Sequence, residues 1–494
     1  MPPKAIFVQV ALPYWLDVAA KLRDNYSWEI CYLIGRKKKE RVSKLFPDTV
    51  YHSKGEIRDN LAPDGCRAVK PSPLDKPLLA SLSYHESIFL KMMDRQNFNG
   101  ALTYFERIST YHSQIMYWKG VLEHFKPDVV VYRIEPHVTH EYALYALCRI
   151  MDIPTVMFQR TSLPGYIYPV RSFEEGSETI RKAYIRALGK GNKQHGSLSP
   201  GTVSHLEKLS KSYDNAIPFH LKYKLSHHKN SGDVTGPVST LLRVAKVLYK
   251  AFQDKRAGLE MDSNYLFKKY HTNMGSFKRK KLLAYYNRLA KPVDLTKPYV
   301  FVALQCEPER QTCPVGGLFG NQYLMVDLLS KLIPDDWIIY VKEHISQFKD
   351  YQTVERAKTK EFYNMLVSRP NVEIVPLTYN SFELIDHAKA SATVSGTVGW
   401  ESVVRGKPTL LFGYSWYSDC KGVFVTHTIE DCEKAIQKIK NGFKPDMDVV
   451  KCFAQVVEKC AVRGYNDKMG TKMNMISYEE NVENLARAIH EFVT

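Results

Sequence analysis

The sequence predicts an α/β protein with two doubly wound domains. Short runs rich in Val and Ile alternate with helix-like segments on both sides of a central basic stretch. Buried parallel strands have such continuous apolar runs because helices cover both faces of their sheet. At roughly 100–200 residues per domain, 494 residues suffice for at least two such units. Each strand and helix below is assigned from this alternation.

The first predicted domain covers residues 1–215. Its strand-like runs are AIFVQVAL, WEICYLIG, VVVY and IPTVMFQR, in this order. The segments YWLDVAAKLRDN and THEYALYALCRIMD have helical periodicity and lie between strands. Strands separated by helices are typical of βαβ units with a parallel sheet. We therefore expect a Rossmann-like domain with a parallel sheet.

The second predicted domain covers residues 296–494. Its strand-like runs lie at 299–305, 337–344, 372–376, 390–396 and 408–413, and its helix-like segments lie at 321–333, 360–368, 381–389 and 399–406. This pattern again favours a doubly wound sheet. The last helix of the chain is a candidate to cross back to the first domain.

A basic, mostly helical connecting segment is predicted at 216–295. Residues 221–291 hold 16 Lys or Arg and four acidic residues, a net charge of +12 out of the +17 of the whole chain. The stretch VSTLLRVAKVLYKAF within it has an apolar and a basic side when helical. Such a helix can pack on a core with its charges solvated, or lie on an anionic membrane or an acidic acceptor. No nucleic-acid-binding motif accompanies the charge, so nucleic acid is not the expected partner.

Cysteine usage and hydropathy indicate a cytoplasmic protein, at most peripheral to a membrane. The nine cysteines are odd in number and form no C-x-x-C pair, which fits a reducing compartment. No apolar run reaches about 18 residues, so no membrane-spanning helix is expected. The first apolar stretch is short and is interrupted by Pro13, and we interpret it as a buried strand, not a signal peptide.

The clearest functional motif is Ser395-Gly396-Thr397, at the end of the fourth predicted strand of the second domain. Small residues allow a ligand to approach the backbone, and the free N–H groups of a following helix favour phosphate. Glu401, one turn into that helix, could reach ribose hydroxyls. The alternative is a tight turn with a helix cap and no ligand.

Polar residues also follow two other strands of the second domain. Lys342 and His344 end the second strand, where their charge suits a nucleotide phosphate, although His344 could also be a buried structural histidine. Gln305 and Glu309 follow the first strand. Ligands bind beyond the carboxyl ends of strands in open α/β sheets, so we expect these residues to face a cleft.

The first domain supplies the candidate catalytic residues. Glu135 and His137 follow the strand at 129–132 and could act as a general base toward an acceptor hydroxyl. Arg133 and Arg160 end strands of the same domain and are expected on the acceptor side. No metal is expected, because H-E-x-x-H is absent and the D-x-D at 446–448 follows no predicted strand.

Three segments of the second domain resemble the capsule polysaccharide biosynthesis family. They are LQCEPERQTCPVGG, YVKEHISQF and SFELIDHAKASATVSGTVGWESVVRGKPTLLFGYSWY. That family is similar to the bacterial capsule β-Kdo transferases, which have the GT-B fold of two Rossmann-type domains facing a cleft. The likeness covers about 299–425, and VYRIEPHVTHEYALYALCRIMDIPTVMFQ is similar to its front-domain segment. Related GT-B enzymes have His-Pro where this chain has His344-Ile345.

The resemblance implies a metal-independent glycosyltransferase that needs no cofactor. It would transfer a sugar from a nucleotide-activated donor, CMP- or UDP-linked, to a glycan or lipid-linked acceptor in surface polysaccharide biosynthesis. One alternative is a nucleotide-sugar 2-epimerase, which has the same fold and needs no acceptor. Another is a glycan-assembly scaffold that binds nucleotide without turnover.

Overall fold

The computed structural model describes residues 2–36, 39–58, 61–63, 65–66, 69–95, 102–189, 197–211, 213, 275, 278–348, 357–467 and 476–494. Most of the predicted basic segment at 216–295 lies outside these residues. In the part of the chain that the structure describes, no helix combines the length and the hydropathy needed to cross a bilayer.

The first sheet has seven strands in the order β13-β6-β5-β4-β1-β2-β3. The bounds are β1 Lys4–Val10, β2 Glu29–Gly35, β3 Val50–Ser53, β4 Val129–Tyr132, β5 Thr155–Arg160, β6 Tyr166–Val170 and β13 Val462–Arg463. Strands β1 to β5 pair in parallel, whereas β6 and β13 are antiparallel additions at one edge. The parallel part has the order of a Rossmann-like sheet.

Helices cover both faces of this sheet. Their bounds are α1 Pro13–Tyr26, α2 Lys39–Leu45, α3 Lys54–Arg58, α4 Lys76–Met92, α5 Tyr104–Phe125 and α6 Thr139–Ile150, with a 3-10 turn at Met93–Arg95. Two further helices, α7 Glu178–Gly189 and α8 Pro200–Lys211, follow β6 and pack against α18 (Met447–Cys460) and α16 (Thr397–Val404), respectively. Ile6 and Val8 of β1 join the core under α4, α5 and α6, while Ala5 and Phe7 join the core under α1. Alternate residues of a strand point to opposite faces, so a strand buried on both sides is apolar throughout.

The second sheet has six parallel strands in the order β12-β11-β10-β7-β8-β9. The bounds are β7 Tyr299–Ala303, β8 Ile338–Lys342, β9 Val372–Ile374, β10 Ala390–Thr393, β11 Thr409–Leu411 and β12 Val423–Val425. Its helices are α12 Gln322–Leu332, α14 Lys360–Val367, α15 Ser381–His387, α16 Thr397–Val404 and α17 Ile429–Lys440, with 3-10 turns at Gly317–Gly320 and Ile345–Phe348. The predicted pair of Rossmann-type sheets is confirmed.

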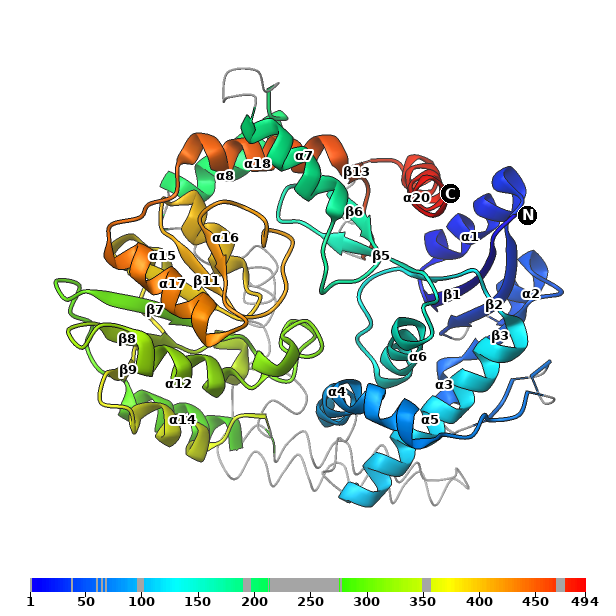
Figure 1. Ribbon diagram of the computed structural model, residues 1–494, viewed down its shortest axis with the longest axis horizontal. Helices are drawn as coiled ribbons and strands as arrows, with labels where there is room; N and C mark the ends of the chain where they lie inside the picture. The colour runs from blue at the N-terminus through cyan, green and yellow to red at the C-terminus, as the bar shows by residue number, and fades with distance from the viewer. Residues whose placement is uncertain are drawn as a thin grey trace, which may run out of the picture.

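The end of the chain returns from the second domain to the first (Figure 1). Helix α18 (Met447–Cys460) follows α17 and packs against α7, and β13 then joins the first sheet beside β6. Helix α20 (Tyr478–Val493) lies on α1, where Leu485, Ala486 and Ile489 are buried in the same core as Trp15 and Leu22. The two domains are thus joined by contacts far apart in sequence.

Within the described residues, the strands and helices predicted for the two domains form, with ends shifted by a few residues. The basic helix predicted from VSTLLRVAKVLYKAF lies outside the described residues. Helix α16 begins at Thr397, one or two residues before the predicted start. The short strands β3, β12 and β13 and the antiparallel β6 were not predicted, because they lack a long apolar run. The D-x-D at 446–448 opens a helix: Asp446 is the N-cap of α18, and its carboxylate accepts from the backbone N–H of Asp448 at 2.9 Å.

Candidate functional site

Each sheet has a topological switch point, between β1 and β4 in the first domain and between β7 and β10 in the second. Ligands of open α/β sheets bind outside the carboxyl ends of the strands at such points. Glu135 and His137 follow β4, Gln305 follows β7, and Ser395 follows β10. These four predicted residues therefore follow strands at the two switch points.

In each domain, a glutamine at the switch point forms hydrogen bonds with residues that follow the neighbouring strand. Gln9, near the end of β1, has a positive φ of 65° and donates from Nε2 to Glu141 Oε2 at 2.8 Å. Its Oε1 accepts from the backbone N–H of Ile134 at 3.0 Å. Gln305 does the same after β7: its Oε1 accepts from the N–H of Ser395 at 2.9 Å, and its Nε2 donates to Ser395 Oγ at 3.3 Å. Gln9 was not among the predicted residues, although a polar residue inside the apolar run AIFVQVAL was a signal.

Glu141, in the first turn of α6, organises the site of the first domain. Its side chain is fully buried and accepts from Lys54 Nζ at 2.7 Å and from the N–H of His137 at 3.3 Å. His137 Nδ1 lies 3.3 Å from Glu141 Oε2. Burial acts to raise the pKa of Glu141, but the charge of Lys54 and its hydrogen bond to the carboxylate act against burial, and this pKa lies well below its ordinary value. Glu141 is therefore a permanent carboxylate that orients His137.

The histidines of this cluster are neutral. Burial lowers the pKa of His137 to about 4, against the opposing effect of Glu141 and with the help of Lys54, Arg310 and Arg95. Burial likewise lowers the pKa of His140 to about 3, and no described residue bonds its Nε2. A neutral imidazole whose Nδ1 faces a carboxylate carries its proton there and leaves Nε2 able to accept one.

Ion pairs join the two switch points across the domains. Glu135 lies 3.2 Å from Arg310 Nη1, which belongs to the loop after β7. Lys91 of α4 lies 3.5 Å from Glu307, and Arg95 Nη2 donates to the carbonyl of Cys313 at 2.7 Å. Glu135 is thus held in an ion pair with Arg310. Of the two predicted general bases, His137 is therefore the more suitable, because its Nε2 can accept a proton.

The other predicted residues of the first domain face a different segment. Arg133 donates from Nη1 to the carbonyl of Asn466, and Arg160 lies 2.7 Å from Asp467 Oδ2. Both arginines therefore bind the segment after β13, and among the described residues neither forms a hydrogen bond or ion pair with Glu135 or His137. Their predicted place on the acceptor side stays a prediction.

The Ser395-Gly396-Thr397 loop is held by its own domain. Ser395 Oγ donates to the carbonyl of Gln311 at 2.7 Å, and the N–H of Gly396 donates to Thr393 Oγ1 at 3.2 Å. With Ser395 N–H bonded to Gln305, two backbone donors and one hydroxyl are already used. In the described part of the chain, nothing accepts from the N–H groups of Thr397 and Val398 at the start of α16, so these are the donors left for an anion.

Glu401 lies one helical turn beyond these two N–H groups. Thr397 Oγ1 donates to its Oε1 at 2.8 Å. Burial raises the pKa of Glu401 to about 7, against the opposing effects of this hydrogen bond and of Arg405. The carboxyl is therefore partly protonated near neutral pH and can both donate and accept.

Three predicted residues around β8 and β7 have partners within the second domain. Lys342 Nζ donates to Ser381 Oγ at 2.9 Å and to the carbonyl of Tyr379, and burial lowers its pKa to about 8. His344 Nδ1 accepts from the N–H of Ser346 at 3.2 Å. Glu309 lies in the loop after β7, where its backbone carbonyl accepts a hydrogen bond from Thr312 Oγ1 at 2.9 Å. All three lie on the carboxyl side of the sheet, but these contacts do not bring Lys342 to Ser395.

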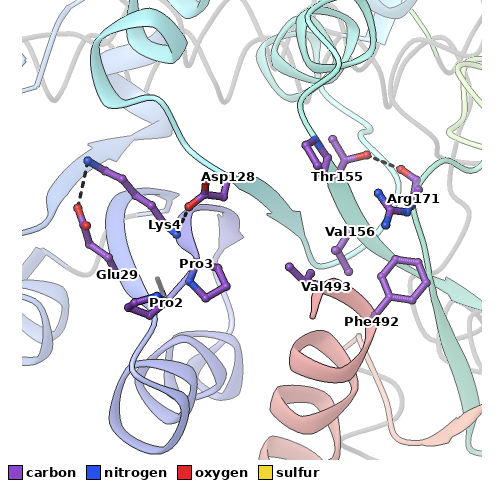
Figure 2. A pocket seen from close by; sticks show the side chains of 11 residues that line it. Pro2, Pro3, Lys4, Glu29, Asp128, Thr155, Val156, Arg171, Phe492 and Val493 are labelled. Carbon is purple, nitrogen blue, oxygen red and sulfur yellow. Dashed lines mark hydrogen bonds and ion pairs between the residues drawn. The ribbon is translucent and has the colours of Figure 1, made fainter.

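A pocket of about 570 Å³ lies at the amino ends of strands of the first sheet, opposite the carboxyl ends that form the switch point (Figure 2). It is lined by residues at the amino ends of β1, β2 and β5 and by Phe492 and Val493 of α20. Its charged side chains are largely paired: Lys4 Nζ lies 3.1 Å from Glu29, and the N–H of Lys4 donates to Asp128 at 2.8 Å. None of the predicted site residues lines it. Within the described residues, no group of three or more His, Cys, Asp or Glu is arranged to hold a metal ion.

Residues 269–460 match the family model of the capsule polysaccharide biosynthesis protein. The resemblance to this family is confirmed there. The match covers less than half of the chain and contains the whole Ser395-Gly396-Thr397 loop. No curated protein matches the chain.

The solved structures that match the chain include transferases and epimerases. The chain is 14% identical to the β-Kdo 2,7 transferase KpsC of Thermosulfurimonas dismutans, with a TM-score of 0.24 over 44% of this chain and 62% of that chain. It is 15% identical to the UDP-GlcNAc 2-epimerase of Methanocaldococcus jannaschii, with a TM-score of 0.25 over 92% of this chain and 99% of that one. The β-Kdo 2,4 transferase KpsC of T. dismutans has 15% identity and a TM-score of 0.24, over 66% and 82% of the two chains. The chain thus spans less than two thirds of the first of these, and no function is carried over from any of them.

Proposed function

We propose that this protein is a glycosyltransferase that moves a sugar from a nucleotide-activated donor to a glycan or lipid-linked acceptor in capsule-like polysaccharide biosynthesis. The observation that carries the proposal is the family match over residues 269–460, whose phosphate-type loop lies at the switch point of the second sheet. A CMP- or UDP-linked sugar is the proposed donor, and no metal takes part.

The nucleotide phosphate is proposed to bind at the start of α16. The N–H groups of Thr397 and Val398 and the positive end of the helix would neutralise the leaving phosphate. Gln305 and Ser395 would act by holding the loop, since their hydrogen bonds are made to each other. Glu401 would bind ribose, and Lys342 and His344 would contribute positive charge and polarity at the neighbouring strand end.

His137 is the proposed general base. Its Nε2 would take the proton from an acceptor hydroxyl, whose oxygen then attacks the anomeric carbon while the bond to the nucleotide phosphate breaks. Glu141 would position the ring and stabilise the imidazolium that forms. Glu135 would hold Arg310 across the cleft and so keep the two switch points together.

Proline at position 397 offers a sharp test of phosphate binding. Thr397 is the first residue of α16, where proline is tolerated, and Gly396 before it has φ −73° and ψ 157°, a conformation compatible with a following proline. Thr397→Pro therefore deletes one N–H with little change of backbone. We expect affinity for CMP or UDP to fall about 10- to 150-fold in calorimetry, because a charge-assisted hydrogen bond contributes about 1.5–3 kcal/mol.

Thr397→Ala is the matched control, since it also loses the hydroxyl but keeps the N–H. Equal affinity for CMP or UDP in the proline and alanine variants would show that the nucleotide phosphate does not bind the N–H of residue 397. Turnover of a nucleotide sugar without any acceptor would instead favour the epimerase, and binding without turnover would favour the scaffold.

The base is tested by His137→Gln with a sugar-transfer assay. We expect kcat to fall about 10²–10⁴-fold with nucleotide affinity unchanged, because only proton removal is lost. His112→Gln on the exposed face of α5 serves as the control. A variant with the kcat of the wild type would exclude His137 as the base.

A further inference from the structure

A second pocket, of about 170 Å³, lies between the domains on the side of β11. The first domain lines it with the turn after β6 and the start of α7, and the second domain lines it with the loop after β11 and with β12. Pockets for drug-sized ligands run from roughly 300 to 1,000 Å³, so this one has room for a single ring.

The pocket adjoins the loop of the proposed nucleotide site. The N–H of Gly413 donates to the carbonyl of Val394 at 2.7 Å, directly before Ser395. Tyr417 Oη donates to the carbonyl of Gly396. A ring bound in the pocket would therefore lie beside the place where the nucleotide phosphate is proposed to bind.

Aromatic rings from both domains form one part of its wall. Phe173 and Tyr414 meet edge to face with centroids 6.0 Å apart, and Tyr414 meets the ring of His427 at 5.2 Å. Tyr168 and Trp416 line it as well, and Tyr168 Oη donates to the carbonyl of Trp416 at 3.4 Å. Aromatic faces pack well against the C–H face of a pyranose ring, which is apolar although its edge is polar.

Charged side chains also line the pocket, among them Glu174, Arg181 and Asp419. Glu174 Oε2 accepts from Ser172 Oγ at 2.6 Å and from Tyr145 Oη, whereas no described residue donates to its Oε1. Arg181 of α7 reaches across the domains to Asp419 at 2.8 Å. A carboxyl and a guanidinium–carboxylate pair can each bind two neighbouring hydroxyl groups of a sugar.

We propose that this pocket binds one pyranose ring of the acceptor glycan. The assignment rests on the proposed transferase function and deepens it by naming the acceptor class. An acceptor, not the donor sugar, is the better fit because half of the wall comes from the first domain, which does not form the phosphate loop. Burial of Glu174 raises the pKa of its carboxyl.

The test uses saturation-transfer NMR with the full-length protein and millimolar methyl glycosides of glucose, galactose, mannose, N-acetylglucosamine, glucuronic acid, rhamnose and Kdo. We expect at least one glycoside to bind, and His427→Ala to weaken it about three- to tenfold by removing an exposed ring. Glu174→Gln keeps the shape of the pocket and should weaken binding to a similar extent. Thermal-shift responses to CMP and UDP should stay those of the wild type in both variants.

Competition separates the possible outcomes. Saturating CMP or UDP should leave the glycoside bound, and Thr397→Pro should weaken nucleotide binding while the affinity for the glycoside stays that of the wild type. Displacement of the glycoside by nucleotide sugars but not by nucleotides would assign the pocket to the donor sugar and overturn the proposal. Nucleotide binding with no glycoside signal would overturn it while leaving the transferase proposal standing. Glycoside binding with no nucleotide binding would show that the transferase proposal, and with it the acceptor role, had failed.

Discussion

At the scale of single residues, the site depends on polar side chains that bond one another across long stretches of sequence. Gln9 and Glu141 are 132 residues apart, and Gln305 and Ser395 are 90 apart. Buried polar groups are costly without partners, so these hydrogen bonds fix the geometry of both switch points. Ser395 is hydrogen-bonded to Gln305 and to Gln311 within its own domain, and its role as a direct ligand stays a prediction.

Glu401 should make nucleotide binding depend on pH. Its pKa is raised to about 7, so the folded protein holds this proton at pH 6 and loses it by pH 8. A carboxylate near a bound phosphate repels it, and we expect the affinity for UDP to weaken about fivefold from pH 6 to pH 8. Calorimetry at both pH values measures this.

Glu401→Gln separates this effect from titration of the nucleotide itself. The glutamine variant should show only the smaller pH dependence of UDP, with the affinity of the wild type at pH 6. An identical pH dependence in both proteins would mean that Glu401 lies too far from the phosphate to affect it.

At the scale of elements, the position of α16 depends on a close contact between helix and loop. A Cβ at Gly399 would lie 2.4 Å from Tyr417 Oη and 2.8 Å from Cζ of the same ring. Tyr417 is fully buried and its hydroxyl donates to the carbonyl of Gly396. The helix can therefore approach the loop after β11 only because position 399 has no side chain.

Gly399→Ala should lower the free energy of unfolding by about 1–3 kcal/mol, the usual cost of overpacking. It should also weaken nucleotide binding, because α16 must move away from Tyr417. Urea unfolding and calorimetry measure the two effects. Gly201→Ala in α8, where a Cβ meets nothing within 4 Å, is the control and should change stability by less than about 1 kcal/mol. A Gly399 variant as stable as this control would contradict the contact.

At the scale of the whole molecule, the last helix stabilises the domain in which the chain begins. Leu485 and Ile489 of α20 are fully buried in the core that contains Trp15 of α1. Ion pairs such as Glu135–Arg310 and Arg181–Asp419 then join the two domains. Substitutions near the end of the sequence should therefore act on the first sheet.

Leu485→Ala should cost about 2–5 kcal/mol of stability, as expected for a large-to-small change in a core. The loss should appear in the fluorescence of the tryptophans near α1 during denaturation. Arg487→Ala, on the exposed face of the same helix, should leave stability within about 0.5 kcal/mol of the wild type. Equal unfolding curves for the two variants would contradict the packing of α20 on α1.

The sequence alone was sufficient to predict the two Rossmann-type sheets, the approximate ends of their main strands and the position of the loop at Ser395-Gly396-Thr397. Apolar periodicity and small residues at a strand end are local properties, and they do not depend on what the rest of the chain does. The tertiary structure decided which side chains meet. The pairing of Glu141 with Lys54, of Glu135 with Arg310 and of α20 with α1 follows from the order of strands and the path of the chain between domains. Such contacts leave no local pattern in the sequence, because each partner is an ordinary polar or apolar residue until the fold brings the two together.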